Sequence, residues 1–585
     1  MVPSDMTERI PGRARGMRLG QAAVLFSVLT LALTWPQVLH PGSVPDDKDS
    51  YFNLWRLAWI AHQLPLDPLR LFDANIFAPL PLTLAFSDAV LLEGLIAAPA
   101  IWAGLPAVHA LNALVLASFL ACGLGAFLLV RQLTGDAGAA VVAGVIFAFA
   151  PYRFDHYHHL ELLWAQWLPL TLWMCHRALE SGRLAYGLWA GCCFALQGLS
   201  SIYYAVFFAV VLAGLLPVLV TTVPGALRRR VLVSLASGAL LAAFVLAPYM
   251  LPYRAARTLV GDRDEGSIRL YSAGPSHYLA PMPSSVAYGA ATGGLGSPEK
   301  RLFVGFLPIG LVAIALWPPV DRRRLAYALA LAIAVDGTLG HRGLLYPFLR
   351  EHIDVFMGLR VPARFGHLVL LGTSVMAGFG LARLNRRLER LRPRLAGAAN
   401  WTIGALVVGE YFMWPMALVP VQTVPDDASL WLRSQPPGIV ADLPLPRSTA
   451  DIANDARAAY RSTFHWQPLL NGYSGFYPAS YVDLWAPVAS FPDDRSLAAL
   501  RGRGVSYLLV RQAGFGADGY VVAVDRLARR CDVRGAGPFP DGSSTTMIYV
   551  VARHGEGCAT GLDGLSGPAH PGDNERSPSA RPAIR

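Results

Sequence analysis

Charged residues are scarce in this sequence of 585 residues: Asp, Glu, Lys and Arg together make up only 15%, whereas 54% of the residues are hydrophobic. The mean hydropathy of +0.41 is too high for a soluble protein of this length. The composition therefore excludes an ordinary soluble enzyme and predicts a polytopic membrane protein. The net charge of +10 does not indicate nucleic-acid binding, because the basic residues form short clusters between apolar runs, as in the cytoplasmic loops of membrane proteins.

Three further absences narrow the interpretation. No small-residue cleavage site follows the first apolar run at residues 19–38, so we interpret this run as an uncleaved helix and not as a signal peptide. No repeat of fixed period is present, although many carriers contain one. No HExxH motif is present either, so a metal site would lack its strongest sequence signature.

Twelve apolar runs are candidates for crossing a hydrocarbon core that is roughly 30 Å thick. They lie at residues 19–38, 88–104, 107–130, 137–151, 160–176, 184–200, 202–222, 231–251, 302–318, 324–340, 365–383 and 398–418. The basic clusters at 177–183, 228–230, 322–324 and 383–394 should be cytoplasmic, as should the basic residues before the first run. These placements agree only if one run before residue 151 does not cross, and Asp88 and Glu93 make 88–104 the candidate. We expect eleven crossings, or thirteen if one span is missed.

The predicted fold class is therefore an α-helical polytopic membrane protein with about eleven transmembrane helices and a C-terminal extracytoplasmic α/β domain. Its expected parts are a cytoplasmic N-terminus (1–18), a transmembrane domain (19–420) with outer loops at 39–87 and 252–301, an α/β domain (421–554) and a disordered tail (555–585). In the α/β domain we expect a helix over 426–435 and strands over 438–443, 505–510 and 545–551. Cys531 and Cys558 are candidates for a disulfide if this domain is extracytoplasmic.

Three carboxylates, Asp46, Asp47 and Asp49, directly follow the first apolar run. The next ten residues, 51–60, have apolar positions at helical spacing and predict a helix in the membrane interface, with Trp55 and Trp59 on one face. Asp49 is a candidate general base for deprotonating a hydroxyl group. The alternative is a solvated acidic loop. Asp47 and Asp49 also have the spacing of a metal–nucleotide motif, which is common by chance.

Further polar groups are predicted on the same side of the membrane as the acidic loop. They are Arg153, Asp155, His156, His159 and Glu161 in one segment, and Arg254, Arg360 and Arg364 beside later spans. On a helix, His156 and His159 would share a face, which suits a phosphate-facing cluster, or simple interfacial histidines, better than a metal site. Arg360 and Arg364 suit a two-point grip on a phosphate group, or electrostatic anchoring of a span. This arrangement is typical of an outward-facing membrane active site.

Several motifs resemble those of the GT-C superfamily of membrane glycosyltransferases, within a set of uncharacterised bacterial proteins. They are the segments 49–55, 75–79, 83–88, 151–153 with His156 and His159, 166–169, 299–305, 358–365, 460–466 and 471–475. The resemblance covers nearly the whole chain except the tail. It implies that a sugar is transferred, with inversion, from a polyprenyl-phosphate donor that lies among the membrane lipids. The acceptor would be extracytoplasmic and would be a glycan, a lipid or a protein.

The resemblance also implies roles for particular residues. Asp49 would be the base, in a loop shared with Asp47. The donor phosphate would be held by Arg153, His156, His159, Arg254, Arg360 and Arg364. The second acidic residue of the family has three candidate matches, Asp155, Glu161 and Asp262. Some members of the family need a divalent metal ion and others do not, so no metal cofactor is assigned.

Two other functions are compatible with the sequence. One is a flippase or carrier for lipid-linked glycans, for which we would expect charges buried in the middle of spans. Glu410 is the only clear charge of that kind. The other is a non-catalytic assembly factor of the cell envelope whose outer domain recruits partners. All three functions place the protein in the cytoplasmic membrane.

Overall fold

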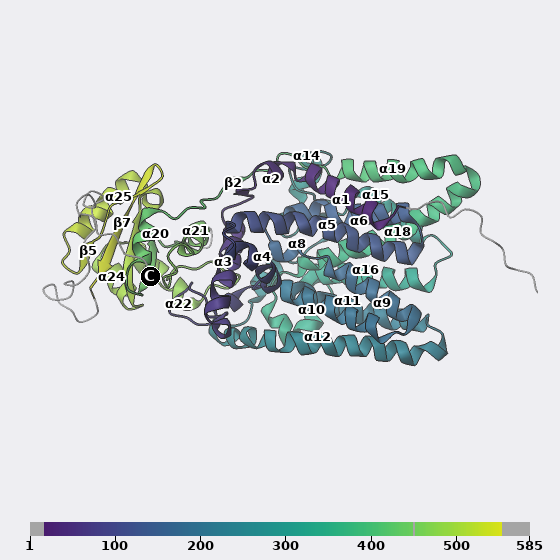
Figure 1. Cartoon of the computed structure of the whole chain (residues 1–585), viewed down its shortest axis with the longest axis horizontal. Helices are drawn as coiled ribbons and strands as arrows, with labels where there is room; N and C mark the ends of the chain where they lie inside the picture. The colour runs from purple at the N-terminus through teal and green to yellow at the C-terminus, as the bar shows by residue number, and fades with distance from the viewer. Residues whose placement is uncertain (1–16, 449–450, 553–585) are drawn as a thin grey trace, which may run out of the picture. The chain divides into compact units, whose positions relative to one another are not determined.

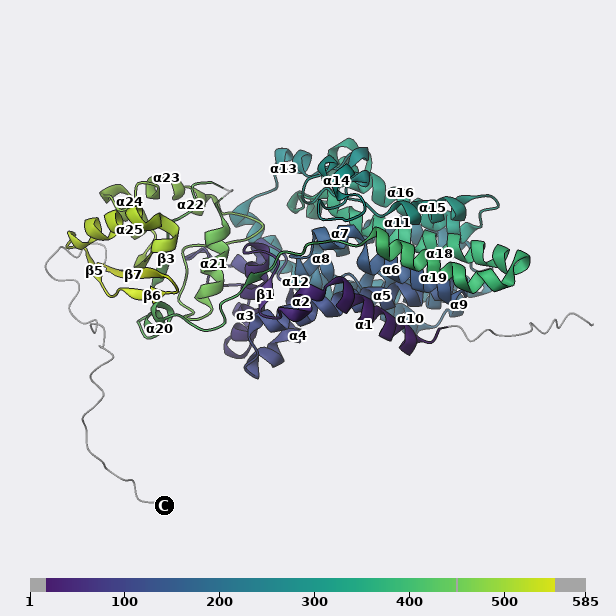
Figure 2. The same cartoon turned by 90° about the horizontal axis from the view of Figure 1, so that it is seen from above.

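The computed structural model describes residues 17–448 and 451–552, which form two compact units (Figures 1 and 2). The first unit contains the residues up to Pro68 and Ser87–Thr423, and the second contains Leu69–Phe86 and the residues from Val424 onwards. The sequence predicts one boundary near residue 420. The structure has a boundary close to that position and also assigns part of the segment 39–87, which the sequence predicts as the first outer loop, to the second unit.

The first unit is a helical bundle. Its helices are α1 (Leu19–Leu33), α2 (Trp35–Leu39), α3 (Asp49–Leu66), α4 (Leu91–Trp102), α5 (Ala107–Thr134), α6 (Ala137–Phe149), α7 (Pro151–Asp155), α8 (Leu160–Leu163), α9 (Trp167–Ser181), α10 (Leu184–Ser200), α11 (Ile202–Thr221), α12 (Gly225–Val260), α13 (Glu265–Leu270), α14 (Gly289–Thr292), α15 (Phe306–Leu316), α16 (Arg322–Leu339), α17 (Leu345–His352), α18 (Gly366–Leu391) and α19 (Pro393–Glu410). Strands β1 (Ser43–Val44) and β2 (Val419–Pro420) pair antiparallel.

Several of these helices are long and apolar enough to cross a membrane. Among the described residues there are five: Ala107–Thr134, Ala137–Asp155, Ile202–Thr221, Gly225–Val260 and Pro362–Leu391. A sixth results if Arg322–Arg342 and Leu345–His352, which meet at a bend of 75°, form one span. The protein is thus a multi-pass membrane protein. The total of eleven crossings stays a prediction.

Helix α4, which corresponds to the run at 88–104, lies at one end of the bundle. Helix α5 connects the two ends, because Arg131 near its C-terminus donates a hydrogen bond to the carbonyl of Met17, and Asn112 near its N-terminus donates to the carbonyl of Pro41 (2.7 Å). The indole of Trp102, the last residue of α4, donates to α3 (2.7 Å). Figure 1 draws α3 across the ends of the long helices. These contacts favour 88–104 as the run that does not cross.

Helix α3 begins two residues before the predicted segment 51–60 and extends beyond it, to Leu66. The two tryptophans stack on each other with ring centroids 6.4 Å apart. They differ from the prediction in their surroundings, because Trp55 is 0% and Trp59 6% exposed. This face of the helix packs inside the protein and is therefore not a membrane-interface face.

Glu410 does not lie in the middle of a span. It is the last residue of α19, and its side chain accepts hydrogen bonds from the backbone N–H groups of Phe306 (2.6 Å) and Leu307 (3.3 Å). These are the first two residues of α15, whose N-terminal N–H groups have no partner within the helix. A carboxylate is favoured there by the helix dipole as well. Glu410 thus has the structural partner that is the default for such a residue.

Helices α10 and α12 approach closely because small residues face each other. A Cβ atom added to Gly191 would lie 2.0 Å from the carbonyl oxygen of Gly238, so no larger residue fits without moving the helix. Close backbone approach at small residues is a common way to pack helices within membranes. The close packing of α10 and α12 therefore depends on these glycines.

The second unit is an α/β structure with a small mixed sheet. Its elements are α20 (Asp427–Arg433), β3 (Ile439–Leu443), α21 (Ala453–Ser462), α22 (Ala479–Val482), α23 (Trp485–Val488), α24 (Asp494–Arg501), β4 (Val505–Arg511), α25 (Gln512–Ala528), β5 (Val533–Gly535), β6 (Phe539–Asp541) and β7 (Ser544–Val551). The strand order is β3-β4-β7-β5, with β6 also on β7, and only the pair β3–β4 is parallel. Figure 2 shows α24 and α25 along one face of the sheet. The predicted helix and the three predicted strands of this region are confirmed.

The segment Leu69–Phe86 extends this unit beyond strand β3. The N–H of Phe77 donates to Asn471 (3.1 Å), that of Ala78 to Leu469 (2.9 Å), and the N–H of Leu469 donates to Asn75 (2.7 Å). The segment around Leu469 is in turn bridged to β3. Part of the first outer loop is therefore integral to the second unit, although the two are far apart in the sequence.

A buried arginine cluster lies at the carboxyl ends of β3 and β4. The Nε of Arg511 donates to both carboxylate oxygens of Asp442 (2.9 and 2.8 Å), and its Nη1 donates to Asp541 (3.0 Å) and Thr546 (3.2 Å). Asp426 lies 3.7 Å from the same Nη1. Burial opposes the charge, but these carboxylates outweigh burial and raise the pKa of Arg511 above its usual range. We name these five residues the Arg511 cluster.

A second buried carboxyl group of this unit is that of Asp455. It accepts hydrogen bonds from the hydroxyl of Tyr481 (2.9 and 2.8 Å) and from the amide of Asn471 (2.9 Å). Burial outweighs these bonds and raises the pKa of Asp455 to about 7. Elsewhere in the unit Cys531 takes part in a disulfide. Cys558 and the predicted tail lie outside the described residues, so the pairing of Cys531 with Cys558 stays a prediction.

Candidate functional site

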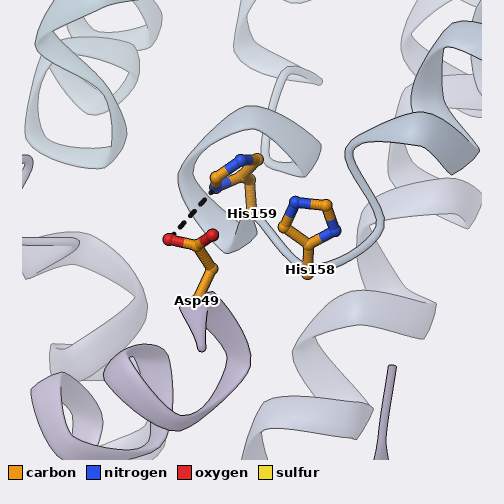
Figure 3. A group of neighbouring side chains, drawn as sticks. All are labelled: Asp49, His158 and His159. Carbon is orange, nitrogen blue, oxygen red and sulfur yellow. Dashed lines mark ion pairs between the residues drawn. The ribbon is translucent and has the colours of Figure 1, made fainter. Parts of the chain in front are cut away.

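The carboxylates of the first loop have different surroundings. Asp46 accepts hydrogen bonds from the N–H groups of Lys48 (3.1 Å) and Ser50 (2.9 Å) and so caps the start of α3. Asp49 is the first residue of α3, and its Oδ1 lies 4.0 Å from the Nδ1 of His159. Figure 3 shows the Asp49 carboxylate directed at this ring, with His158 beside it. Asp47 lies between them and is half-buried.

His159 lies among three carboxylates. Its Nδ1 is 3.6 Å from Glu161 and its Nε2 is 3.6 Å from Glu299, in addition to the contact with Asp49. Burial opposes protonation of the ring, but the carboxylates of Asp49, Glu161 and Glu299 outweigh burial and raise the pKa of His159 to about 9. At neutral pH this side chain is therefore an imidazolium ion.

Each of the other two carboxylates has an arginine of its own. Glu161 accepts from Arg56 (2.9 Å), and Glu299 accepts from Arg364 through both of its oxygens, with the Nε contact at 3.1 Å. Burial would raise the pKa of each acid, but the guanidinium groups and His159 hold both pKa values below the usual range. Three carboxylates thus face two guanidinium groups and one imidazolium, so these charges balance. We name these six residues, Asp49, Arg56, His159, Glu161, Glu299 and Arg364, the His159 cluster.

Glu299 was not among the residues that the sequence predicted. Its backbone has a φ of 69°, which is uncommon for a residue other than glycine, and such strained residues concentrate at functional sites. The Nδ1 of His156 lies 4.0 Å from its carboxylate. The only signal in the sequence was the place of Glu299 at the start of the motif 299–305. Arg56 had no signal beyond its place in the predicted helix 51–60.

Arg360 and Arg364 both contact Tyr203. The backbone N–H of Arg360 donates to the hydroxyl of Tyr203 (3.0 Å), and the guanidinium group of Arg364 lies 5.0 Å from the centre of that tyrosine's ring. The guanidinium group of Arg360 lies 5.7 Å from the ring of Tyr271. Its described side-chain contacts include no carboxylate, so its charge is available to a ligand.

Two other predicted phosphate-binding arginines, Arg153 and Arg254, lie apart from the His159 cluster. Arg153 is fully buried in α7, donates to the carbonyl of Leu163 (3.1 Å) and lies 4.8 Å from the ring of Phe119. Arg254 is exposed on α12. Within the part of the chain that the structure describes, neither has a polar contact with the cluster.

The three candidates for the second acidic residue are separated by the structure. Glu161 belongs to the His159 cluster. Asp155 accepts from Arg301 (2.7 Å), and the exposed Asp262 is paired with Arg257. Within the described chain, Glu299 and Glu161 are thus the acids that share a group with Asp49.

Two sets of side chains have metal-ligand geometry. They are Asp49 with His158 and His159, and His156 with His159 and Glu299, and in each set the ligand atoms lie within 4.8 Å of one another. Both sets contain His159, whose imidazolium form has no lone pair for a metal ion. Both oxygens of Glu299 already accept from Arg364. A metal ion here would have to displace the proton of His159 and, in the second set, compete with Arg364 for Glu299, so we derive no step through one.

No model of a known protein family and no curated protein sequence matches the chain. Among solved structures it is similar to the arabinofuranosyltransferase AftD from Mycobacteria, with a TM-score of 0.61 and 16% identity over 91% of this chain. A mutant of AftD in its class 2 gives a TM-score of 0.59 and 15% identity over 93% of this chain. This chain covers only 40% and 42% of these two structures.

ArnT from Cupriavidus metallidurans in the apo state is similar over 90% of this chain and 97% of its own, with 12% identity, but its TM-score of 0.47 is too low to carry an argument. AftD is a membrane glycosyltransferase of the GT-C superfamily. At these identities the likeness establishes the fold alone, so the chain has the same fold as the matched part of AftD.

Proposed function

We propose that this chain, which has the GT-C fold, is a membrane glycosyltransferase that moves a sugar from a polyprenyl-phosphate donor to an acceptor outside the cytoplasm. The single observation that carries the proposal is the carboxylate of Asp49, which begins the helix α3 and faces the charged His159 cluster. A carboxylate in this environment can take a proton from a hydroxyl group. The proposal includes the cytoplasmic membrane as location and a cytoplasmic N-terminus.

In the proposed reaction Asp49 accepts the proton of the acceptor hydroxyl. The acceptor oxygen attacks the anomeric carbon of the sugar, and the bond from this carbon to the phosphate oxygen breaks. The phosphate leaves with the electron pair, so that the configuration at the anomeric carbon is inverted. A direct displacement of this kind needs a base on one side of the sugar and charge stabilisation of the leaving group on the other.

Arg360 and Arg364 are the proposed stabilisers of the leaving phosphate. Their guanidinium groups lie around Tyr203 and Tyr271, and Arg364 is oriented by Glu299. A phosphate is well matched to guanidinium groups, which donate in a planar, two-point fashion. The imidazolium of His159 adds a further positive charge beside Asp49. Three other candidates for weaker, longer-range stabilisation of the phosphate charge are Arg153, Arg254 and His156.

The alternative of a carrier loses its main support. It required a charge in the middle of a span, and Glu410 is instead a cap at the end of a helix. An assembly factor without catalysis would not need a charge-balanced cluster of this composition. We therefore retain one function.

The proposal is tested with the purified full chain in liposomes that contain undecaprenyl-phosphate pentoses and hexoses, with a glycan extract as acceptor. The readout is the release of undecaprenyl phosphate, which does not depend on the identity of the sugar. Removing a general base lowers turnover by about 10²–10⁴-fold, which we expect for Asp49→Asn. Asp46→Ala, which removes a helix cap in the same loop, should cost about 1 kcal/mol of stability and less than about tenfold in turnover. Equal turnover in Asp49→Asn and the wild type would contradict the role of Asp49.

A further inference from the structure

Asp49 shares one face of α3 with two other polar residues. Asp49, Asn53 and Arg56 are four and three residues apart, a spacing that places side chains above one another on a helix. All three side chains contact the segment 158–161: Asp49 faces His159, and the other two bind its neighbours. All three residues of this face of the helix therefore contact one short segment of the chain.

Asn53 makes the middle contact of this face. Its Nδ2 donates to the carbonyl oxygen of His158 (2.8 Å), and its Oδ1 accepts from Arg56. The residue is 1% exposed, so water does not compete for these bonds. Because the carbonyl belongs to the residue directly before His159, the bond fixes the distance between α3 and the imidazolium.

Arg56 makes the third contact and is 1% exposed. It donates to Glu161 (2.9 Å), to Asn53 and to the carbonyl of Asp88, and its guanidinium group lies 4.4 Å from the ring of Phe52. Burying a guanidinium group is costly unless it is paired and hydrogen-bonded. Here the pairing joins three separate parts of the chain: α3, α8 and the loop before α4.

These contacts close a ring. Arg56 holds Glu161, whose other oxygen is 3.6 Å from His159, and His159 is 4.0 Å from Asp49 at the start of the same helix. A displacement of Asp49 along or around the axis of α3 would break at least one of these contacts. The position of the carboxylate is therefore determined by residues that are one and two turns away from it.

We propose that Asn53 and Arg56 are positioning residues for Asp49, which together hold its carboxylate at a fixed place against His159. This inference rests on the proposed role of Asp49 as the base. Neither residue need touch the substrate. A misplacement of about 1 Å far from the chemistry is sufficient to lower a rate about 10²-fold, so loss of either residue should affect the chemical step and leave donor binding almost unchanged.

The experiment measures kcat and KM for undecaprenyl-phosphate sugars in the liposome assay. For Arg56→Gln we expect kcat to fall about 30–100-fold, with KM for the donor within about twofold of the wild type. Arg56→Lys keeps the positive charge and should recover part of the loss. Asn53→Ala should lower kcat about tenfold, because the bond to His158 is lost while Arg56 still pairs with Glu161.

The matched control is Asn385→Ala. Asn385 is also a buried amide that joins helices, since its Nδ2 donates to Asp136 (2.7 Å) and Asn400 (2.8 Å), but none of these contacts involves the His159 cluster. It should lower the melting temperature about as much as Asn53→Ala and leave kcat within about twofold.

Three results would overturn the inference. They are an unchanged kcat in folded Asn53→Ala, a fall in kcat of the same size in Asn385→Ala, or a loss in Asn53→Ala that lies wholly in KM. If Arg56→Gln does not fold, Asn53→Ala and Arg56→Lys decide the question, because both keep the Arg56 site charged. The proposed function itself is tested first, with the wild-type chain and Asp49→Asn. It is contradicted if the wild-type chain shows no turnover, or if Asp49→Asn does not lower the turnover.

Discussion

Each of the two units buries a cluster of cationic and carboxylate side chains, and the central cations of the two clusters, Arg511 and His159, are bonded differently. In the Arg511 cluster, the guanidinium group donates to oxygen atoms at 2.8–3.2 Å, apart from the longer contact with Asp426. In the His159 cluster, the imidazolium is 3.6–4.0 Å from all three of its carboxylates. The first range is that of hydrogen bonds, whereas the second is too long for them.

This difference indicates what each group is suited for. The donors of Arg511 are used by the protein itself, so the cluster stabilises the sheet and offers little to a ligand. The imidazolium of the His159 cluster is held mainly by charge, which falls off slowly with distance, so its charge also acts on a ligand beside Asp49. A site at which protons and phosphate charges change during a reaction needs such a charge. The cluster around Asp49 is in our interpretation the reactive one of the two.

The largest effect should come from breaking the Arg511 cluster. Arg511→Met removes the guanidinium group that is paired with the buried Asp442 and the half-buried Asp541, and removing one partner of a buried pair costs about 3–5 kcal/mol. We expect the second unit to unfold at lower temperature and to be cleaved first in limited proteolysis of the full chain. A melting temperature within about 2 °C of the wild type would show that the cluster is not stabilising.

A substitution in the His159 cluster should lower turnover more than it lowers thermal stability. Glu299→Gln removes one of the three charges around His159 but keeps a carbonyl oxygen that accepts from Arg364. We expect turnover to fall about 10²-fold, comparable to the loss of one electrostatic stabiliser in other enzymes, with a smaller change in melting temperature than for Arg511→Met. The control is Glu265→Gln, which alters an exposed pair with Arg269 in the same unit and should leave turnover unchanged.

Because Asp455 is buried, we expect the stability of the second unit to depend on pH. The pKa of Asp455 is raised to about 7, so the folded state keeps a proton that the unfolded state loses near pH 4. The corresponding stability is fully present below pH 4 and is lost as the pH rises to about 7. Between pH 5 and pH 8 the loss is on the order of 2 kcal/mol. In Asp455→Asn this contribution should vanish, which the difference in melting temperature between the two proteins at each pH measures.

The smallest effect should come from an exposed pair of the second unit. Asp525 and Arg529 lie one helical turn apart in α25, at 2.7 Å, and both are more than half exposed. Exposed pairs of this kind contribute about 0–1 kcal/mol. Asp525→Asn should therefore leave the melting temperature within about 2 °C of the wild type. A larger change would mean that burial is not what separates the Arg511 cluster from ordinary surface charges.

The sequence predicts the main part of the fold because its signals there are strong and local. Long apolar runs and basic clusters predict the helical bundle, and alternation with turn residues predicts β3, β4 and β7. The assignment of Leu69–Phe86 to the second unit had no such signal, since it depends on hydrogen bonds between residues such as Ala78 and Leu469. Contacts of this sequence separation are not encoded in any short pattern.

The candidate site was predictable in part for the same reason. Asp49 and His159 stand in motifs, so the sequence indicates them, and the structure brings them together. Arg56 is an ordinary residue in the middle of a helix until Glu161 is placed beside it. Glu299 lies in a loop whose path depends on the strained backbone at that residue. The sequence identifies residues that stand in a motif. A residue such as Arg56, whose role depends on its partner Glu161, is identified only in the three-dimensional structure.

The division of the first outer loop has a consequence for the biosynthesis of the protein. The chain passes between the two units three times, after Pro68, after Phe86 and after Thr423. Phe77 is made roughly 400 residues before Leu469, which at about 5–20 residues per second corresponds to a wait of roughly 20–80 s. During this time most of the helical bundle is synthesised while the apolar segment has no partner. A ribosome that stops before Val424 would leave this segment exposed, in a form that quality-control proteases can recognise.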